Sequence, residues 1–344
     1  MGGLLVVGDL NPDIVLTGVP VKEGRLRFGQ AEDLVTTTTL TLGSSAAITA
    51  SAAARAGADA ALVAVVGDDE LGRFCLQRAG DRGIDVTLVR VAVGLRTGSS
   101  VILVSAQEAH DRQILTDLGT MRELRVDDLP DDLLGRFAHV HVSSFFMHTG
   151  ARERLHERLS RSRQLGATVS LDTNDDPARM WASGAAEALT HSDLLFCNDV
   201  EAIGLAGLPG GADPVQVTRV LLSKMAQLPA VRRRAQLPAV VHKRGPLGAT
   251  VHTSHGEVHV AAPAVEVVDT VGAGDTLAGT VIAALLGGAD WPQALALGVA
   301  AASLSTTAAG GVDAQPDSQD TSALAASLRT EDSRTNTEED HDDR

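Results

Sequence analysis

Two kinds of pattern alternate along the chain. Short apolar runs rich in branched residues indicate buried strands at 4–7, 61–66, 140–142, 168–171, 194–197 and 239–241. Helical patterns lie between several of them, at 45–55, 71–82, 152–165 and 214–225. Strands that alternate with helices form parallel βαβ units. The pattern therefore predicts an α/β fold, in which helices flank a doubly wound, mostly parallel sheet.

Two stretches interrupt this alternation. Residues 13–42 and 90–118 are rich in Thr, Val and Gly and lack helical periodicity, so we expect further strands there. Because the chain returns from both stretches to the same α/β core, we expect them to form a small β-sheet lid that is built from insertions.

The composition argues against a nucleic-acid-binding protein. The 344 residues include 29 Lys and Arg against 44 Asp and Glu, which gives a formal net charge of −15, and the aromatic fraction is 2% with no Tyr. A nucleic-acid binder needs a clustered basic surface and, for single strands, aromatic stacking platforms. We therefore expect no nucleic-acid partner.

The sequence also lacks the patterns of export and membrane anchoring. The apolar run at 4–7 has no basic region before it, and the stretches at 277–286 and 294–304 are too short or too Ala-rich to span about 30 Å of lipid. Cys75 and Cys197 have no metal-ligand spacing and are expected to be buried free thiols. We expect a cytoplasmic protein with no membrane partner.

The end of the chain changes character after about Gln315. It becomes rich in Ser, Asp, Thr and Glu, and such a segment buries too little apolar area to offset its ordering entropy. We expect a folded domain over 1–314 and a disordered acidic tail over 315–344. Upstream, QLPAV at 227–231 recurs at 236–240 around three arginines, which indicates a local duplication in a surface loop.

The segment most informative about chemistry is DTVGAGDT at 269–276, which continues into a helical pattern up to Leu286. Gly272 and Gly274 allow a turn whose N–H groups converge beside the positive end of the following helix, an arrangement suited to a phosphate. Asp275, in the first turn of that helix, can accept the proton of a substrate hydroxyl. The plainer alternative is a capping Asp behind a glycine turn. The segment matches neither GxxxxGK[ST] nor the dinucleotide pattern GxGxxG.

This segment resembles the C-terminal signature of the ribokinase-like (PfkB) carbohydrate kinases. Further blocks resemble family motifs in the family's order: GDLNPD at 8–13, LGSSAAITA at 42–50 with ARAG at 54–57, VGDD at 66–69 with GID at 83–85, and the NxxE element at 198–201. The resemblance covers about residues 3–313. It implies a ribokinase-like fold and ATP-dependent phosphorylation of a hydroxyl, expected to be a primary one, on a small sugar or related polyol.

The resemblance assigns the chemistry to the signature segment. Asp275 would be the general base that activates the acceptor hydroxyl. The N–H groups of Gly272, Ala273 and Gly274 would form the anion hole for the transferred group. Fixed donors of this kind stabilise the charge that spreads over the phosphoryl oxygens in the transition state.

The resemblance places Mg·ATP near two other segments. Asn198 and Glu201 would help to hold Mg²⁺, with Glu201 acting mostly through water, because Mg²⁺ dehydrates reluctantly. The alternative is a strand-end cap with Glu201 on a solvated helix face. Gly245 and Gly248 belong to a strand-turn segment that lines the nucleotide, where Lys243 could either neutralise phosphate charge or face solvent.

Sugar recognition is expected at the N-terminal motifs. Asn11 and Asp13 would hydrogen-bond the sugar, while Gly43 and Ser44 would let the loop backbone approach it; a capping role for Ser44 is the alternative. Asn174 follows a strand whose carboxyl end should face the cleft, where ligands of open α/β sheets bind.

The sequence departs from the family pattern at two positions of the glycine-rich loop and helix start, LGSSAAITA at 42–50. Ile48 stands where many members have Asn, and Ser44 replaces the second glycine, so ribose is not assumed to be the substrate. Asp269 and the carbonyl of Val271 correspond to a K⁺ site in monovalent-cation-dependent members. His139 and His141 alternate on a strand, but no family role attaches to them, and we expect them to be structural.

Other functions remain open from the sequence. One alternative is a nucleoside kinase on the same fold, although the scarcity of aromatic residues leaves little for base stacking. Another is a non-catalytic sugar- or nucleotide-sensing protein, which would have no need of a general base. We also expect a homodimer formed through the lid, because a small exposed sheet has edges and an apolar face to cover.

Overall fold

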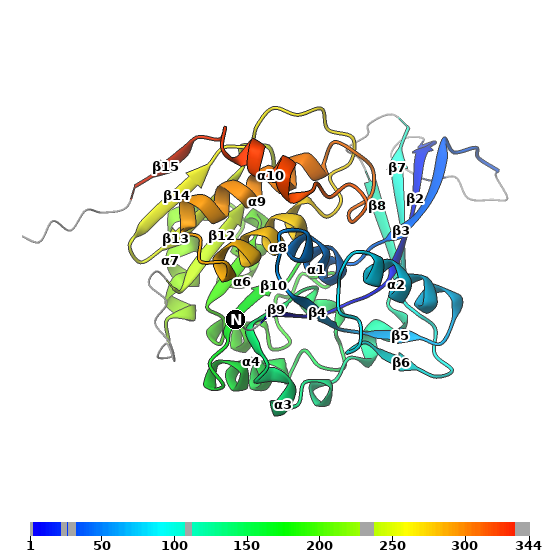
Figure 1. Cartoon of the computed structure of the whole chain (residues 1–344), viewed down its shortest axis with the longest axis horizontal. Helices are drawn as coiled ribbons and strands as arrows, with labels where there is room; N and C mark the ends of the chain where they lie inside the picture. The colour runs from blue at the N-terminus through cyan, green and yellow to red at the C-terminus, as the bar shows by residue number, and fades with distance from the viewer. Residues whose placement is uncertain (1–2, 22–25, 27–31, 107–111, 228–236, 334–344) are drawn as a thin grey trace, which may run out of the picture.

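The computed structural model describes residues 3–21, 26, 32–106, 112–227 and 237–333. Within these residues, a large sheet lies between two layers of helices, and a small sheet stands away from it at the upper right of Figure 1. The predicted α/β architecture is therefore confirmed.

The large sheet has the strand order β15-β14-β13-β12-β11-β10-β9-β1-β4. Neighbouring strands are parallel from β4 to β12 and antiparallel from β12 to β15. The carboxyl ends of the parallel strands thus meet at one edge, where the site lies. The strands are β1 (Gly3–Val7), β4 (Ala60–Val63), β9 (Phe137–Val142), β10 (Thr168–Asp172), β11 (Leu194–Cys197), β12 (Ala239–Lys243), β13 (Ala249–Thr253), β14 (Gly256–Val260) and β15 (Thr330–Asp332).

Both faces of this sheet are buried under helices. In β1, Leu4 and Val6 join one core cluster while Leu5 and Val7 join the other, which is why the strand reads as a continuous apolar run. The first cluster includes residues of α1 (Ser45–Arg55), α2 (Glu70–Asp81), α8 (Ala273–Leu286) and α9 (Trp291–Ser305). The second includes residues of α3 (Asp131–Leu134), α4 (Leu155–Gln164), α5 (Ala185–Thr190), α6 (Asp199–Ala206) and α7 (Pro214–Met225).

The small sheet has the order β3-β2-β7-β8 and lies where the sequence predicts a lid. Its strands are β2 (Pro12–Val19), β3 (Thr37–Leu42), β7 (Ser99–Ser105) and β8 (Arg112–Asp117). The start of the second expected insertion differs, because β6 (Arg90–Ala92) pairs with β5 (Val65–Gly67) outside the lid. The carboxylate of Asp128 holds the Arg90 guanidinium there, with an Nε–Oδ1 distance of 2.9 Å.

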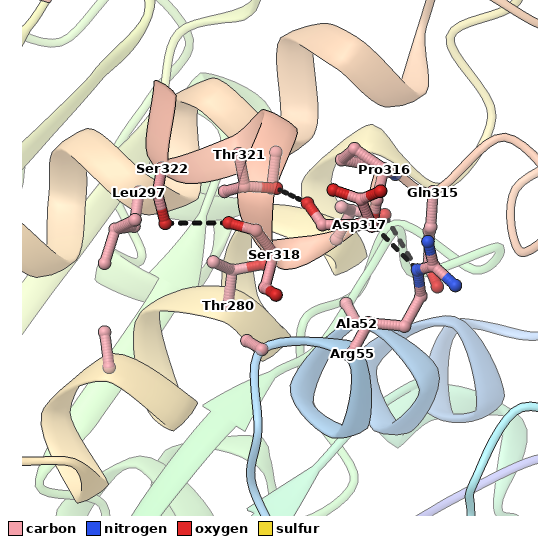
Figure 2. Close-up of a pocket in the computed structure, with 14 residues that line it drawn as sticks. Ala52, Arg55, Thr280, Leu297, Gln315, Pro316, Asp317, Ser318, Thr321 and Ser322 are labelled. Carbon is pink, nitrogen blue, oxygen red and sulfur yellow. Dashed lines mark hydrogen bonds between the residues drawn. The ribbon is translucent and has the colours of Figure 1, made fainter. Parts of the chain in front are cut away.

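The structure differs from the expected disorder over residues 315–333. Residues 318–325 form α10 (Ser318–Ala325), whose first turn is capped by Asp317, and β15 extends the large sheet. Arg55 of α1 donates to the carbonyl of Pro316 at 2.7 Å (Figure 2). Buried Gln315 donates to the carbonyl of Ile48 at 2.8 Å. Polar contacts help to order this segment, although its composition predicts no ordered structure. The rest of the expected tail, 334–344, lies outside the described residues.

Three smaller expectations can be compared with the fold. Cys75 and Cys197 are buried and form no disulfide, as predicted. Over the part of the chain that the structure describes, no helix is long and apolar enough to cross a membrane. Most of the QLPAV duplication, with the arginines between its copies, lies outside the described residues.

Candidate active site

The glycine-rich turn at the start of α8 is built as the sequence predicts. Gly272 is the N-cap and has a left-handed φ of 73°, a conformation that favours glycine. A Cβ at this position would also lie 2.8 Å from Cδ1 of Ile48. Space and backbone geometry both require glycine here. The first N–H groups of α8 have no acceptor within the helix, and that of Ala273 makes only a long contact, of 3.4 Å, to the carbonyl of Thr270.

Asp275 lies in the first turn of α8 and is only 9% exposed. Its carboxylate accepts a hydrogen bond from the hydroxyl of Ser45, the first residue of α1. Burial raises the pKa of Asp275 to about 7; Asp172 adds to the rise and Lys243 opposes it. A carboxyl group with this pKa can serve as a proton acceptor near neutral pH.

The positive charge of Lys243 acts on three carboxylates, those of Asp275, Asp172 and Glu201. Its Nζ donates to Oδ2 of Asp172 at 2.7 Å and lies 3.6 Å from Oε2 of Glu201. Burial works against the charge, but the two carboxylates more than offset it, and the pKa of Lys243 is raised. A Cβ on Gly274 would lie 3.2 Å from Cδ of the lysine, so Lys243 passes beside the anion turn and does not face solvent.

Asn198 and Glu201 form a reciprocal cap on α6. The Asn198 side chain accepts from the Glu201 N–H at 2.9 Å, and Oε2 of Glu201 accepts from the Asn198 N–H at 2.8 Å. Asn198 thus caps α6, and Glu201 is 4% exposed and does not lie on a solvated face. Burial raises the pKa of Glu201, against the effect of Lys243.

These groups bear on where a divalent cation would fit. The described residues contain no cluster of three or more His, Cys, Asp or Glu side chains able to hold a metal alone. Mg²⁺ that arrives with ATP needs only one or two carboxylates and keeps several waters. The carboxylate of Glu201, next to Asn198 in the α6 cap, fits that mode of binding through water.

Asn11 and Asp13 lie together beneath the lid. Asn11 is 2% exposed, and its Oδ1 has no hydrogen-bond partner, while its Nδ2 lies 3.4 Å from Oδ1 of Asp13. Burial and the nearby charges of Asp9, Asp269 and Asp275 raise the pKa of Asp13 to about 7. A Cβ on Gly43 would lie 2.1 Å from Cγ of Asp13, so this glycine lets the loop pass close to the carboxyl group.

The hydroxyl of Ser44 makes its hydrogen bonds within the protein. It donates to the carbonyl of Asp9 at 2.9 Å and accepts from the N–H of Ala47 at 3.2 Å, so it caps α1. Asn174, with a φ of 54°, accepts on Oδ1 from the Ser45 hydroxyl at 3.1 Å. Asn174 and Asp275 therefore both contact the hydroxyl of Ser45.

The possible K⁺ segment lies beside the lid. Both carboxylate oxygens of Asp269 accept backbone N–H groups, from Val271 at 2.9 Å and from Gly310 at 3.0 Å. Arg112 of β8 donates to Oγ1 of Thr270 at 3.1 Å, and its Nη1 lies 4.0 Å from Oδ1 of Asp269. The guanidinium of Arg112 thus joins the lid to the signature segment.

Gly245 and Gly248 flank the short 3₁₀ turn Gly245–Leu247 between β12 and β13, with φ values of 54° and 89°. A Cβ on Gly248 would lie 2.0 Å from the carbonyl oxygen of Val260. These glycines shape the turn that follows Lys243.

Sequence reasoning missed several residues of the cleft. Asp172 ends β10, at the same carboxyl strand end that placed Asn174 at the cleft, but it was assigned no role. Asp9 belongs to the first motif, where its carboxylate accepts from the Ala46 N–H at 3.1 Å and fastens the loop before α1. Ser45 was recognised only as part of a helix start. Nothing in the pattern of β8 singles out Arg112.

The comparisons with known proteins agree with this geometry. The family described as pfkB family carbohydrate kinase matches residues 1–318. The aminoimidazole riboside kinase of Salmonella typhimurium is 30% identical over 70% of this chain and 73% of its own length. The 2-dehydro-3-deoxygluconokinase of Thermoproteus tenax is 30% identical over 80% of this chain and 83% of its own.

Solved structures share the fold. Arabidopsis thaliana ribokinase complexed with ribose and ATP superposes with a TM-score of 0.76 and 22% identity, over 94% of this chain and 98% of that one. An E. coli structure that contains ATP and Mg²⁺ gives a TM-score of 0.78 at 20% identity, over 95% and 99%.

Fold, site and relatives together define an ATP-dependent kinase that acts on a sugar or a nucleoside. The chain belongs to the pfkB family of carbohydrate kinases, as its motifs indicate.

Proposed function

We propose that this kinase phosphorylates a hydroxyl, most simply a primary one, of a small neutral sugar or related polyol, with Asp275 as the general base. The observation that carries the proposal is the position of Asp275. It is buried in the first turn of α8, directly after the Gly272–Gly274 turn, and its pKa is raised to about 7. A proton acceptor and an anion-binding helix end thus lie within one turn of each other.

The chemistry follows from this arrangement. The acceptor hydroxyl gives its proton to the Asp275 carboxylate while its oxygen attacks the γ-phosphorus of ATP. The bond from that phosphorus to the bridging oxygen of the β-phosphate breaks, and ADP leaves with the bonding electrons. The N–H groups of Gly272, Ala273 and Gly274 stabilise the charge on the phosphoryl oxygens. When bound, Mg²⁺ neutralises phosphate charge, and we assign Asn198 and Glu201 to its water shell. Lys243, beside the turn, contributes a fixed positive charge, and Gly245 and Gly248 shape the neighbouring nucleotide wall.

A neutral polyol suits the groups beneath the lid. The unpartnered Oδ1 of Asn11 needs a donor, and a sugar hydroxyl is one. Asp13, with a pKa of about 7, can accept from a second hydroxyl or donate to it. Gly43 leaves room for the approach, while Asn174 closes the base of the cleft. Ser44 takes part through its backbone, because its hydroxyl is used as a cap.

A panel of acceptors tests the substrate class. The relatives are named for a sugar acid and a riboside, so the panel contains neutral sugars, sugar acids and nucleosides, with ADP release as the readout. We expect turnover with at least one neutral sugar or polyol. Turnover with nucleosides alone would replace this proposal with the nucleoside alternative, and turnover with sugar acids alone would also refute it.

The same panel, run with and without K⁺, tests Asp269 and the Val271 carbonyl as a monovalent-cation site. We also propose that the protein works in the cytoplasm, as a homodimer formed through the lid.

A further inference from the structure

A short segment between α9 and α10, residues 310–316, contacts both the lid and the signature segment. At its start, the N–H of Gly310 donates to Oδ2 of Asp269 at 3.0 Å. Further along, the carboxylate of Asp313 accepts from the hydroxyl of Thr41, on strand β3 of the lid, at 2.9 Å. The 310–316 segment therefore touches the parts of the molecule that enclose the cleft.

Gln315, near the end of this segment, is 5% exposed and makes hydrogen bonds with its whole side-chain amide. Its Nε2 donates to the carbonyl of Ile48 at 2.8 Å and to Oγ1 of Thr276 at 3.1 Å. Its Oε1 accepts from the hydroxyl of Ser51 at 2.6 Å. Because a carbonyl oxygen can only accept, the amide nitrogen has to face Ile48. One side chain thus cross-links α1 to α8, and Figure 2 shows it beside Pro316, next to α1.

Both helices are held at residues that support the anion turn at Gly272–Gly274. The N–H of Thr276 donates to the carbonyl of Gly272 at 2.8 Å, so it closes the turn from which α8 starts. The side chain of Ile48 packs on the same turn, since an added Cβ on Gly272 would lie 2.8 Å from its Cδ1. Gln315 therefore binds the two residues that hold the turn in place.

The contact between α1 and α8 is made by small residues. An added Cβ on Gly279 would lie 2.2 Å from the carbonyl oxygen of Thr49 and 2.9 Å from Cβ of Ala52. Apolar packing is not directional, and small side chains offer few ridges that stop one helix from sliding along the other. Hydrogen bonds have a preferred distance and angle. The Gln315 amide therefore fixes the position of the first turn of α8 along α1.

We propose that Gln315 is a positioning residue, which acts through Thr276 and the backbone of Ile48 to hold the anion turn in the arrangement that phosphoryl transfer needs. The loop before α1 belongs to the expected sugar site, and α8 carries the anion turn and Asp275. The relative position of the two helices therefore sets the distance between the acceptor hydroxyl and the phosphoryl group. A displacement of about 1 Å in such a site can cost about 100-fold in rate. The inference rests on the role proposed above for the anion turn.

The first test separates positioning from stability. Gln315→Met keeps the length of the side chain and removes its hydrogen bonds. Lys224→Met is the matched control, because the ammonium of Lys224 on α7 also links two helices, by donating to the carbonyls of Leu205 and Ala206 of α6 at 2.8 and 3.0 Å. Thermal unfolding gives the Tm of each variant, and ADP release with the best acceptor of the panel, well below every Tm, gives kcat and KM.

We expect Gln315→Met to lower kcat at least about tenfold while the KM for the acceptor changes less than about threefold, because the groups that bind the acceptor are unaltered. Lys224→Met should keep kcat within about twofold of wild type, whatever its Tm. A kcat of Gln315→Met that equals that of wild type would overturn the proposal, and so would an equal loss of kcat in Lys224→Met.

The second test asks whether Gln315 acts through Thr276. Thr276→Val removes the hydroxyl that Gln315 contacts and keeps the shape of the side chain, whereas Thr276→Ser keeps the hydroxyl. We expect Thr276→Val to lower kcat and Thr276→Ser to retain it. The double variant Gln315→Met with Thr276→Val should have the kcat of Gln315→Met alone, because both changes break the same link.

Losses in the two single variants that multiply in the double variant would overturn the proposal. If Gln315→Met does not fold, Thr276→Val carries the test alone, and a wild-type kcat in that variant would overturn it. Failure of the proposed function would look different. In that case Asp275→Asn would retain turnover, whereas failure of this inference alone would leave Asp275→Asn inactive and Gln315→Met active.

Discussion

Asp13 and Asp275 show how single residues in the cleft are adjusted for function at some expense of stability. Burial, reinforced by neighbouring carboxylates, raises the pKa of each to about 7. For Asp13 the folded value of about 7 exceeds the reference value of 3.8. Between these two values the folded protein holds a proton that the unfolded chain has released. Stability therefore decreases as pH rises through this window and changes little above it.

Asp13→Asn removes this effect and should stabilise the protein at high pH. We expect its Tm to exceed that of wild type by about 2 to 5 °C at pH 8, with a smaller difference at pH 5. Thermal unfolding of the two proteins across this range makes the measurement, and Asp132→Asn, on the exposed surface, is the control. A Tm difference that does not change with pH would contradict the assignment.

The sequence predicted residues of the cleft where a backbone constraint or a carboxylate lies within a motif, as for Gly272 and Asp275. It predicted poorly where the role depends on long-range packing. Asp172 and Lys243 meet across 71 positions of the chain, and Arg112 reaches Thr270 across 158. Such pairs leave no local periodicity.

At the scale of elements, α1 and α8 place the two halves of the site together. Each begins at a residue with positive φ, Ser44 and Gly272, and each directs its first turn into the cleft. The two helices pack closely, since a Cβ on Gly279 would lie 2.2 Å from the carbonyl oxygen of Thr49. The position of the anion turn therefore depends on the packing of α8 against α1.

Gly272→Ala should damage this turn beyond the cost of its backbone conformation. Gly207→Ala is a matched control, because Gly207 has the same φ of 73° but no atom within 4 Å of an added Cβ. We expect Gly207→Ala to cost about 1–2 kcal/mol of stability with kcat/KM preserved. Gly272→Ala should cost at least as much and lower kcat/KM more than tenfold. Equal kcat/KM in the two variants, measured by ADP release, would contradict the role of the turn.

The elements whose bounds the sequence predicted best have clear ends, such as the N-cap residues Ser44 and Asp213. The bounds of α1, α7 and β11 coincide with the patterns at 45–55, 214–225 and 194–197. In contrast, α9 was not predicted as a helix, because its buried residues, among them Leu295, Ala296 and Val299, surround most of its axis and leave no clear periodicity. Residues 318–325 were read as disordered because their composition is polar, and tertiary contacts decided otherwise.

At the scale of the whole molecule, the lid presents an apolar surface that the rest of the described residues leave exposed. The strand register aligns Leu40, Ile14, Val101 and Leu115 across its four strands, on the face opposite Asp13. Leu40 and Leu115, at the two ends of this stripe, are 46% and 47% exposed. An apolar stripe on a small sheet is a natural surface for a second copy of the chain.

Leu115→Glu should separate the proposed homodimer. Light scattering of the wild type should give twice the mass of one chain, and the variant should give the monomer mass, because a buried glutamate has no partner across the stripe. Val93→Glu, at an exposed apolar residue outside the lid, should remain dimeric. A monomeric wild type, or a dimeric Leu115→Glu, would refute the interface.

The central claim is that Asp275 takes the proton of the acceptor hydroxyl. Asp275→Asn keeps the size of the side chain and an oxygen to accept from Ser45, but it removes the base. Using the best acceptor from the panel at pH 8, we expect kcat to fall by at least about 100-fold, while ATP affinity by calorimetry stays close to that of wild type. Phosphoryl transfer at near wild-type rate by this variant would contradict the account.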